Sequence, residues 1–259
     1  MGKITGGERD ALLLEVLKRL KDAKPHADAA AWERGWQEAL ARFRANPTED
    51  ALIPAFIRDE PVRLGNSFFK SNNTELGYVR HVQAELLDLL QNCENIHEFG
   101  CGTGFNTVAL ANRAPGKAYV ACDRSWAAVQ IVLEASERFQ LPILAGQFDM
   151  LKPHGSMPYG AGVFTFGSME QLGEFRPFIN WLIGFKPAMV VHIEPIPELL
   201  DPNNLLDWLS LEFHRKRGYT VGLLPYLQAH PGVEVLQAQR SHFGSLMLES
   251  YARVVWRTK

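Results

Sequence analysis

The stretch "NIHEFGCGTGFN", residues 95–106, carries the strongest structural signal in this sequence. A short apolar run leads there into three glycines within five positions, Gly100, Gly102 and Gly104, and Glu98 stands two places before the first of them. Glycine at the end of a strand permits a positive φ and lets a ligand approach the backbone without a Cβ in the way. A strand that passes through such a turn into a helix is typical of sites for nucleotide-like ligands.

Chain length, composition and charge limit the class of protein. The 259 residues fit one large domain, or one domain with an appendage. With 46% apolar and 22% charged residues, the composition is that of an ordinary globular protein. The formal net charge of -2 gives no electrostatic basis for binding nucleic acid or an anionic membrane, so we expect neither partner.

The cysteines and the N-terminal sequence bear on cellular location. Cys93, Cys101 and Cys122 form no CxxC pair, so neither a disulfide framework nor a zinc site is indicated. The first ten residues lack the apolar core of a signal peptide, and no apolar stretch approaches transmembrane length. These features predict a cytoplasmic protein that is a monomer or a homodimer.

From residue 95 onward, short apolar runs alternate with helical stretches. The runs that we expect to be parallel strands cover residues 95–100, 118–123, 141–146, 162–167 and 188–195. This alternation predicts an α/β fold in which helices cover both faces of the sheet. Two further runs, 233–243 and 248–257, alternate in polarity and are joined without a helix, which predicts an antiparallel hairpin at the sheet edge. The expected sheet is therefore seven-stranded and mostly parallel.

The N-terminal region has a different pattern. Residues 8–45 repeat apolar residues at helical spacing with charges between them. We expect residues 1–75 to form an N-terminal helical cap and residues 76–259 to form the α/β core. Within the cap, residues 61–75 are polar and bear Gly and Asn, which indicates a lid that opens and closes over a site.

Three common motifs that contain glycine or histidine do not fit the turn after residue 99. The nicotinamide or flavin pattern G-x-G-x-x-G needs a glycine where Phe105 stands. A P-loop needs Ser or Thr after Gly-Lys, and the Gly-Lys pair at 116–117 is followed by alanine. The run "HEFGC" is not a zinc HExxH motif, because Cys101 holds the place of the second histidine.

What remains is E-x-G-x-G-x-G at the end of a first strand, with Asp123 at the end of the second strand. This arrangement resembles the class I S-adenosylmethionine-dependent methyltransferases, and a final antiparallel hairpin is the topological mark of that family. The resemblance covers roughly residues 76–259. It implies S-adenosylmethionine as the cofactor and a Rossmann-like core.

The resemblance also implies which residues contact the cofactor. The α-ammonium group needs a carboxylate, which Glu98 can supply, and the ribose diol needs a two-oxygen acceptor, which Asp123 can supply. The other positions that match the family pattern are Gly100, Gly102, Gly104, Arg124, Phe148, Asp149, Met150 and Gly167. Simpler roles remain open: the glycines can serve backbone geometry alone, Asp123 can help cap the helix that follows it, and Phe148 and Met150 can be core residues.

The methyl acceptor calls for groups at the carboxyl ends of the strands. Methyl transfer is an in-line displacement that depends on alignment, and a hydroxyl or ammonium acceptor must also lose a proton to a base. The candidates are Glu170 after the fourth strand, His192 and Glu194 on one face of the fifth strand, and Tyr78 from the region of the cap. His192 is either a base that Glu194 orients, or a hydrogen-bonded core histidine beside a carboxylate that caps a turn.

These observations predict transfer of a methyl group from S-adenosylmethionine to an oxygen or nitrogen of a small molecule. A metal-assisted, catechol-type transfer lacks a clear cluster of acidic ligands, so we expect no metal. Two alternatives remain: a non-catalytic S-adenosylmethionine-binding protein of the same fold, and a protein or peptide methyltransferase. An enzyme requires an open cavity lined by His192, Glu194 or Glu170, whereas a binding module should fill that space with apolar side chains.

Overall fold

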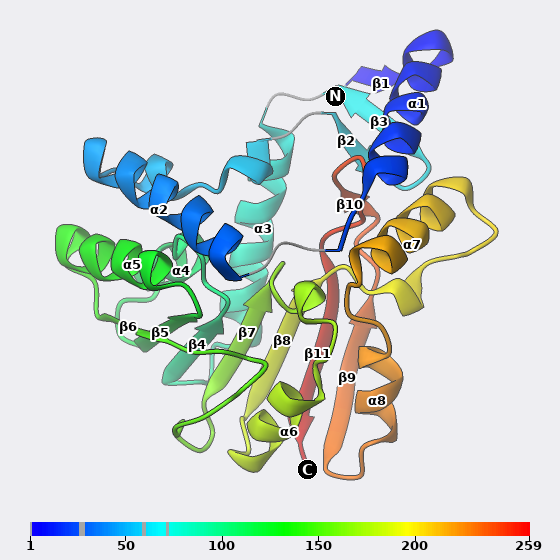
Figure 1. Ribbon diagram of the computed structural model, residues 1–259. Helices are drawn as coiled ribbons and strands as arrows, with labels where there is room; N and C mark the ends of the chain where they lie inside the picture. The colour runs from blue at the N-terminus through cyan, green and yellow to red at the C-terminus, as the bar shows by residue number, and fades with distance from the viewer. Residues whose placement is uncertain (1, 26–28, 59–60, 71–72) are drawn as a thin grey trace.

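The computed structural model describes residues 2–25, 29–58, 61–70 and 73–259, and a seven-stranded sheet lies at its centre (Figure 1). The strand order is β6-β5-β4-β7-β8-β11-β9. The strands are β4 (Asn95–Phe99), β5 (Ala118–Asp123), β6 (Ile143–Gln147), β7 (Gly162–Phe166), β8 (Met189–Glu194), β9 (Val233–Gln239) and β11 (Ala252–Thr258). The first five run parallel, and β11 is antiparallel to both β8 and β9. The predicted α/β sheet with its antiparallel final hairpin is confirmed.

Helices cover both faces of the sheet because successive strand residues point to opposite sides. In β8, Val190 packs with the cluster of α6 (Arg176–Gly184) and α8 (Leu223–Ala229), and its neighbour Val191 packs with the cluster of the helices on the other face. The helices of that second face are α3 (Thr74–Leu89), α4 (Phe105–Arg113) and α5 (Trp126–Phe139). Both valines are fully buried, so the sheet forms the middle layer of the core.

A second, four-stranded antiparallel sheet lies beyond the carboxyl ends of the parallel strands (Figure 1). Its order is β1 (Gly2–Ile4), β3 (Ser67–Lys70), β2 (Val62–Leu64) and β10 (Phe243–Gly244). Residues 62–70 therefore form a hairpin, although their polar pattern predicted a lid segment. Strand β10 lies between β9 and β11 in the chain. The sequence predicted Phe243 as the last residue of the strand run 233–243, but β9 ends at Gln239 and Phe243 pairs with β2 instead. From here on, the name cap means this sheet together with α1 (Gly6–Asp22) and α7 (Leu205–Arg217), and no longer the predicted cap of residues 1–75.

The two N-terminal helices lie in different places. Helix α1 packs on α7 within the cap, whereas α2 (Ala29–Ala45) packs along α5 of the core (Figure 1). Two polar contacts fix α2 there: Arg44 Nε donates to Glu134 Oε1 at 3.0 Å, and Glu33 accepts the backbone N–H groups of Trp126 and Ala127 at 3.1 Å each. Since those N–H groups lie in the first turn of α5, the Glu33 carboxylate also neutralises the positive end of that helix.

Short 3₁₀ helices complete the fold. They are η1 (Glu49–Leu52), η2 (Ala55–Arg58), η3 (Met169–Leu172) and η4 (Pro197–Leu199). The first two connect α2 to the cap hairpin, and η3 follows the carboxyl end of β7. The segments that leave the strands and the segments that enter the cap therefore meet on the same side of the sheet.

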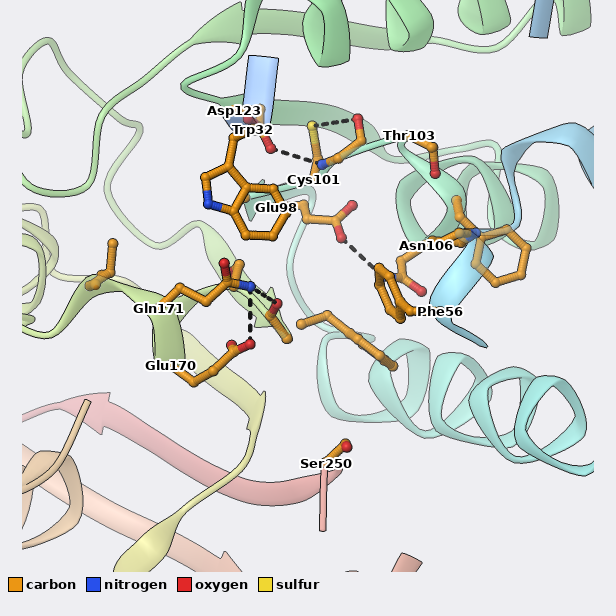
Figure 2. Close-up of a pocket in the computed structure, with 18 of the residues that line it drawn as sticks. Trp32, Phe56, Glu98, Cys101, Thr103, Asn106, Asp123, Glu170, Gln171 and Ser250 are labelled. Atoms are coloured by element: carbon orange, nitrogen blue, oxygen red, sulfur yellow. Dashed lines mark hydrogen bonds between the residues drawn. The ribbon is translucent and has the colours of Figure 1, made fainter. Parts of the chain in front are cut away.

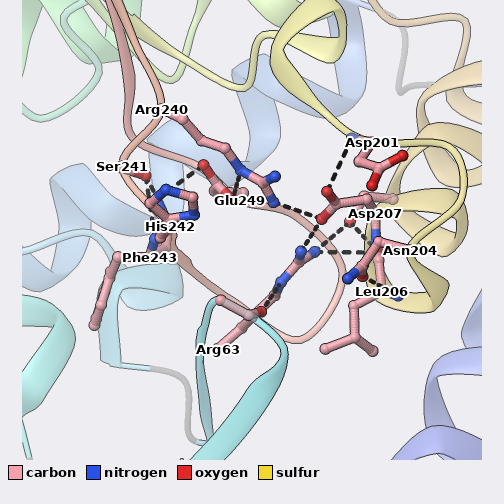
Figure 3. A network of polar contacts seen from close by, with 12 residues as sticks. Arg63, Asp201, Asn204, Leu206, Asp207, Arg240, Ser241, His242, Phe243 and Glu249 are labelled. Atoms are coloured by element: carbon pink, nitrogen blue, oxygen red, sulfur yellow. Dashed lines mark hydrogen bonds and ion pairs between the residues drawn. The ribbon is translucent and has the colours of Figure 1, made fainter.

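A buried ion network holds the cap together (Figure 3). Arg63 of β2 and Asp207 of α7 are each 1% exposed and form an ion pair. Arg240, which follows β9, reaches the same Asp207 carboxylate at 2.6 Å and Glu249 at 2.7 Å. Arg63 also donates to the backbone carbonyl of Leu206 at 3.1 Å. The network thus joins β2, α7 and the segment that precedes β11.

Candidate functional site

A cavity of about 350 Å³ lies where the carboxyl ends of the parallel strands face the cap (Figure 2). Residues that follow β4, β5, β6, β7 and β8 all contribute to its wall. The rest of the wall includes residues of α2, of η2 and of the segment 245–251, which precedes β11. The cavity volume lies in the range of small-molecule sites, and the carboxyl edge is where α/β sheets bind ligands.

The glycine turn forms the floor of this cavity at Gly100 and Gly102, with φ of 76° and 52°. A Cβ on Gly100 would lie 2.3 Å from Cβ of Ser168, and one on Gly102 would lie 2.6 Å from Cη2 of Trp36. Both positions therefore need glycine for the backbone conformation and for the close approach of a neighbour. Gly104 begins α4 and does not line the cavity.

Glu98 ties the end of β4 to the start of α4. Its carboxylate is 1% exposed and accepts hydrogen bonds from Asn106 Nδ2 at 3.1 Å, from the Thr107 N–H at 3.1 Å, and from the Thr107 hydroxyl. Burial raises the pKa of Glu98 to about 7, although these donors favour the charged form. Glu98 reaches the cavity wall, but most of its hydrogen-bonding capacity serves the turn itself.

Asp123 ends β5 and lines the cavity beside the glycine turn. Its Oδ2 accepts the Gly102 N–H at 2.9 Å, and its Oδ1 accepts the Ser125 N–H at 2.9 Å. Helix α5 has its own N-cap in Ser125, whose hydroxyl accepts the Ala128 N–H at 3.2 Å. A carboxylate oxygen has two lone pairs, so each oxygen of Asp123 can accept one further hydrogen bond from a ligand hydroxyl.

The other predicted cofactor residues meet at the same cavity. Phe148 and Met150 are buried, and the ring of Phe148 packs 4.8 Å from that of Phe99. The predicted positions that line the cavity with them are Arg124, Asp149 and Gly167. The structure therefore brings nine of the ten predicted cofactor residues to this cavity, and Gly104 is the exception. Phe148 and Met150 also belong to the hydrophobic core.

His192 is a core residue, and its prediction as the general base is wrong. Its side chain is 0% exposed and does not line the cavity. Trp256 Nε1 donates to His192 Nε2 at 3.0 Å, so the proton resides on Nδ1, which donates to the Thr165 hydroxyl at 2.9 Å. Burial lowers the pKa of His192 to about 3. The imidazole is therefore neutral, fully hydrogen-bonded and out of reach of an acceptor.

Glu194 and Tyr78 also do not line the cavity. The buried Glu194 carboxylate accepts backbone N–H groups of η3 and the residue before it, including Ser168 at 3.0 Å and Met169 at 3.1 Å. It caps a turn, which is the simpler of the two roles that the sequence allowed. Tyr78 stacks on Phe243 with ring centroids 4.3 Å apart. Direct contact of these two side chains with an acceptor is therefore not supported.

Glu170 is the predicted acceptor-side residue that does line the cavity (Figure 2). It is 8% exposed, and its Oε1 accepts from Gln171 Nε2 at 3.1 Å. Its Oε2 is buried and has no hydrogen-bond partner among the residues that the structure describes. Burial and the neighbouring Glu194 raise the pKa of Glu170 well above its usual range. Since Glu194 receives the backbone N–H groups, the proton of this pair resides on Glu170.

Several cavity residues are not among the predicted catalytic or cofactor-binding residues. Glu75 at the start of α3 accepts from the Tyr251 hydroxyl at 2.6 Å, and both side chains are buried in the wall. Trp32 and Trp36 of α2 also line the cavity, with ring centroids 6.3 Å apart. Glu75 stood in the segment expected to be a lid, which was a usable signal. The tryptophans lie on a helix face whose pattern is that of ordinary packing.

Within residues 2–25, 29–58, 61–70 and 73–259, no group of three or more His, Cys, Asp or Glu side chains is arranged to hold a metal ion. In the same residues, no helix has both the length and the apolar character needed to cross a bilayer.

Comparison with known proteins gives matches in structure and none in sequence. No family model and no curated protein matches the chain. The solved [4+2]-cyclase SpnF matches with 12% identity and a TM-score of 0.63, over 91% of this chain and 97% of that one. A coclaurine N-methyltransferase bound to N-methylheliamine and SAH matches with 13% identity and a TM-score of 0.52, over 89% and 73%. An O-methyltransferase from Bacillus cereus in complex with SAH matches with 15% identity and a TM-score of 0.50, over 96% and 99%.

At these identities the matches establish the fold. The chain has the Rossmann-like fold of class I S-adenosylmethionine-dependent methyltransferases, so the resemblance deduced from the glycine turn is confirmed at that level. The same fold also carries the cyclase, and the reaction must therefore be argued from the site.

Proposed function

We propose that this protein binds S-adenosylmethionine and transfers its methyl group to an oxygen or nitrogen of a small molecule. The observation that carries the proposal is one continuous cavity that extends from the glycine turn and Asp123 to Glu170 and Tyr251 beside the cap. An open space lined by Glu170 is the arrangement expected of an enzyme rather than of a filled binding module. Two structural neighbours are O- and N-methyltransferases solved with SAH.

The cavity residues fit the parts of this cofactor. Gly100 and Gly102 leave room beside the backbone, Asp123 can accept the ribose hydroxyls, and Phe148 with Met150 can pack on the adenine. Glu98 lies nearby with three donors already bound, so it contributes to the ammonium site chiefly by holding the turn. When bound, the cofactor supplies an electrophilic methyl group on a sulfonium.

The chain's own residues would position the acceptor. Protonated Glu170 and the amide of Gln171 can donate hydrogen bonds, and the Glu75 carboxylate with Tyr251 offers an acceptor site across the cavity. Alignment of acceptor, methyl carbon and sulfur accounts for most of the rate that such a site supplies. Of these groups, Glu75 is the one with a carboxylate placed to take a proton from an acceptor hydroxyl.

Calorimetry and a transfer assay test the proposal. S-Adenosylmethionine should bind the wild-type protein, and radiolabel from its methyl group should enter the small-molecule fraction of a cell extract rather than the protein fraction. Asp123→Ala should weaken binding by at least about 2 kcal/mol, roughly 30-fold, because hydrogen bonds to a charged acceptor are lost. Asp10→Ala, at an exposed position of α1, should leave affinity unchanged. Absence of cofactor binding by the folded protein would refute the proposal.

A second candidate function follows from the match to the [4+2]-cyclase, whose TM-score is the highest of the three given above. A protein of this fold can catalyse a reaction other than methyl transfer. In that case the wild-type protein would bind the cofactor and Asp123→Ala would weaken that binding as described above, but no radiolabel would enter either fraction of the extract. Label in the protein fraction would instead support a protein or peptide methyltransferase.

A further inference from the structure

Two tryptophans of α2 form an aromatic wall of the cavity that the proposed function does not use. Trp32 and Trp36 stand one helical turn apart, and their rings are nearly parallel, with an interplanar angle of 24°. Both side chains are half-buried and line the cavity. Figure 2 shows Trp32 at the end of the cavity where Asp123 lies.

Trp36 contacts the glycine turn itself. The Cβ position of Gly102 lies 2.6 Å from Cη2 and 2.9 Å from Cζ2 of the Trp36 ring, so any side chain at Gly102 would displace the indole. The N–H of the same Gly102 donates to Asp123 at 2.9 Å. The indole therefore lies against the backbone that positions Asp123, the carboxylate assigned to the ribose.

The position of Trp36 is fixed from outside the cavity. The Glu33 carboxylate lies on the first turn of α5, and Arg44 pairs with Glu134 near the other end of α2. Helix α2 is therefore anchored at both ends to a helix of the core, and its tryptophan face is held over the glycine turn. An aromatic ring held in this way loses little conformational freedom when a ligand packs on it.

We propose that Trp36, supported by Trp32, packs on the adenosine half of the bound cofactor. This inference rests on the proposed function. It assigns to α2 a part in cofactor binding, separate from the acceptor side that Glu170, Glu75 and Tyr251 form. Every base has a π-face, and stacking of a base on an aromatic side chain is generally strong enough to measure by alanine substitution.

The test is calorimetric titration with two probes, S-adenosylhomocysteine and adenosine. Trp36→Ala should weaken binding of both probes by a similar factor, roughly 10- to 100-fold, and Trp32→Ala by less. Trp36→Phe retains an aromatic face and should recover most of the affinity, which also covers the case in which the alanine variant folds poorly. Trp208→Ala is the matched control, because Trp208 is an exposed tryptophan of α7 outside the cavity.

Several outcomes would overturn the inference. Wild-type affinity in folded Trp36→Ala would show that the ring makes no contact with the ligand. Tighter binding would show that the indole occupies the site and must leave it. A loss for S-adenosylhomocysteine alone would place the ring on the homocysteine half, and an equal loss in Trp208→Ala would indicate a general effect on folding. If the wild-type protein binds neither probe, the proposed function fails first, and this inference falls with it.

Discussion

Replacing Asp207 by asparagine should lower the free energy of unfolding by about 3 kcal/mol. Asp207 accepts from two guanidinium groups. Arg63 is 1% exposed and otherwise donates to neutral groups, the carbonyls of Gly65 and Leu206 and the Ser210 hydroxyl. Removing one partner of a buried ion pair typically costs about 3–5 kcal/mol, because the other charge stays buried without compensation. We expect the lower end of this range, since asparagine keeps one acceptor oxygen and Arg240 keeps its pair with Glu249.

The loss should depend on pH in a defined direction. Burial alone would raise the pKa of Asp207, but the hydrogen bonds from Arg240, the Asp201 N–H and Arg63 hold that pKa below its usual value. A carboxyl group whose folded-state pKa is lowered contributes stability that is complete above its unfolded pKa, about 4, and is lost as the pH falls below it. The difference in free energy of unfolding between wild type and Asp207→Asn should therefore be constant between about pH 6 and pH 8, and it should shrink as the pH falls below about 4.

Urea denaturation at neutral pH measures this difference, with equal m-values as the condition for comparing midpoints. Glu234→Gln is the matched control, because it breaks the Arg257–Glu234 pair, whose partners are 51% and 44% exposed. An exposed pair contributes at most about 1 kcal/mol. If Asp207→Asn costs no more than this control, the buried network does not hold the cap in the way described here.

Three other substitutions test separate features. Gly100→Ala should abolish cofactor binding and lower the melting temperature, because its Cβ would lie 2.3 Å from Ser168 at a φ of 76°; Gly116→Ala, with open space around its Cβ, should do neither. In wild type, the buried His192 stays neutral between about pH 6.5 and pH 3, so the free energy of unfolding should fall by up to about 1.4 kcal/mol per pH unit as the pH falls. His192→Phe should remove this dependence, as measured by urea denaturation at several pH values. Glu170→Gln should keep turnover within about tenfold at neutral pH in the radiolabel assay, because a neutral donor replaces a neutral donor; a fall of roughly 10²–10⁴-fold would show that Glu170 acts as the ionised base.

The parallel sheet could be predicted because each strand carries its own signal. The runs that became β4 to β8 are short and bounded by glycine, proline or a charged residue, and those of β5 to β8 are mostly apolar. In β4, Asn95, His97 and Glu98 are polar, and the glycine turn that follows was the signal. Strand β10 has no such signal: Phe243 and Gly244 extend only by pairing with Leu64 and Arg63, about 180 positions earlier in the chain. Residues 62–70 did carry a hairpin signal, the two-residue turn Gly65-Asn66 between residues 62–64 and 67–70, and the lid prediction overlooked it.

The side of the cavity that we assign to the cofactor was predictable for a similar reason, and the side that we assign to the acceptor was not. The glycine turn, Asp123 and Gly167 follow directly after strands, so the topology alone brings them to one edge. The role of His192 depended on Trp256, which β11 places beside it in the core. The sequence of α2 shows which of its faces is apolar, but not that Trp36 lies against Gly102 and lines the cavity.

The pairing of β10 with β2 also affects how the chain can fold as it is synthesised. About 180 residues separate Leu64 from Phe243. At translation rates of roughly 5–20 residues per second, β10 is therefore synthesised about 10–35 s after the hairpin of β2 and β3 with which it pairs. During that time the apolar side chains of Val62 and Phe68, buried in the finished protein, lack part of their final cover. In the nascent N-terminal segment these side chains therefore stay partly exposed until nearly the whole chain has emerged. A chain that stops before residue 243 should consequently show its defect first at the opposite terminus, as proteolysis within residues 62–70.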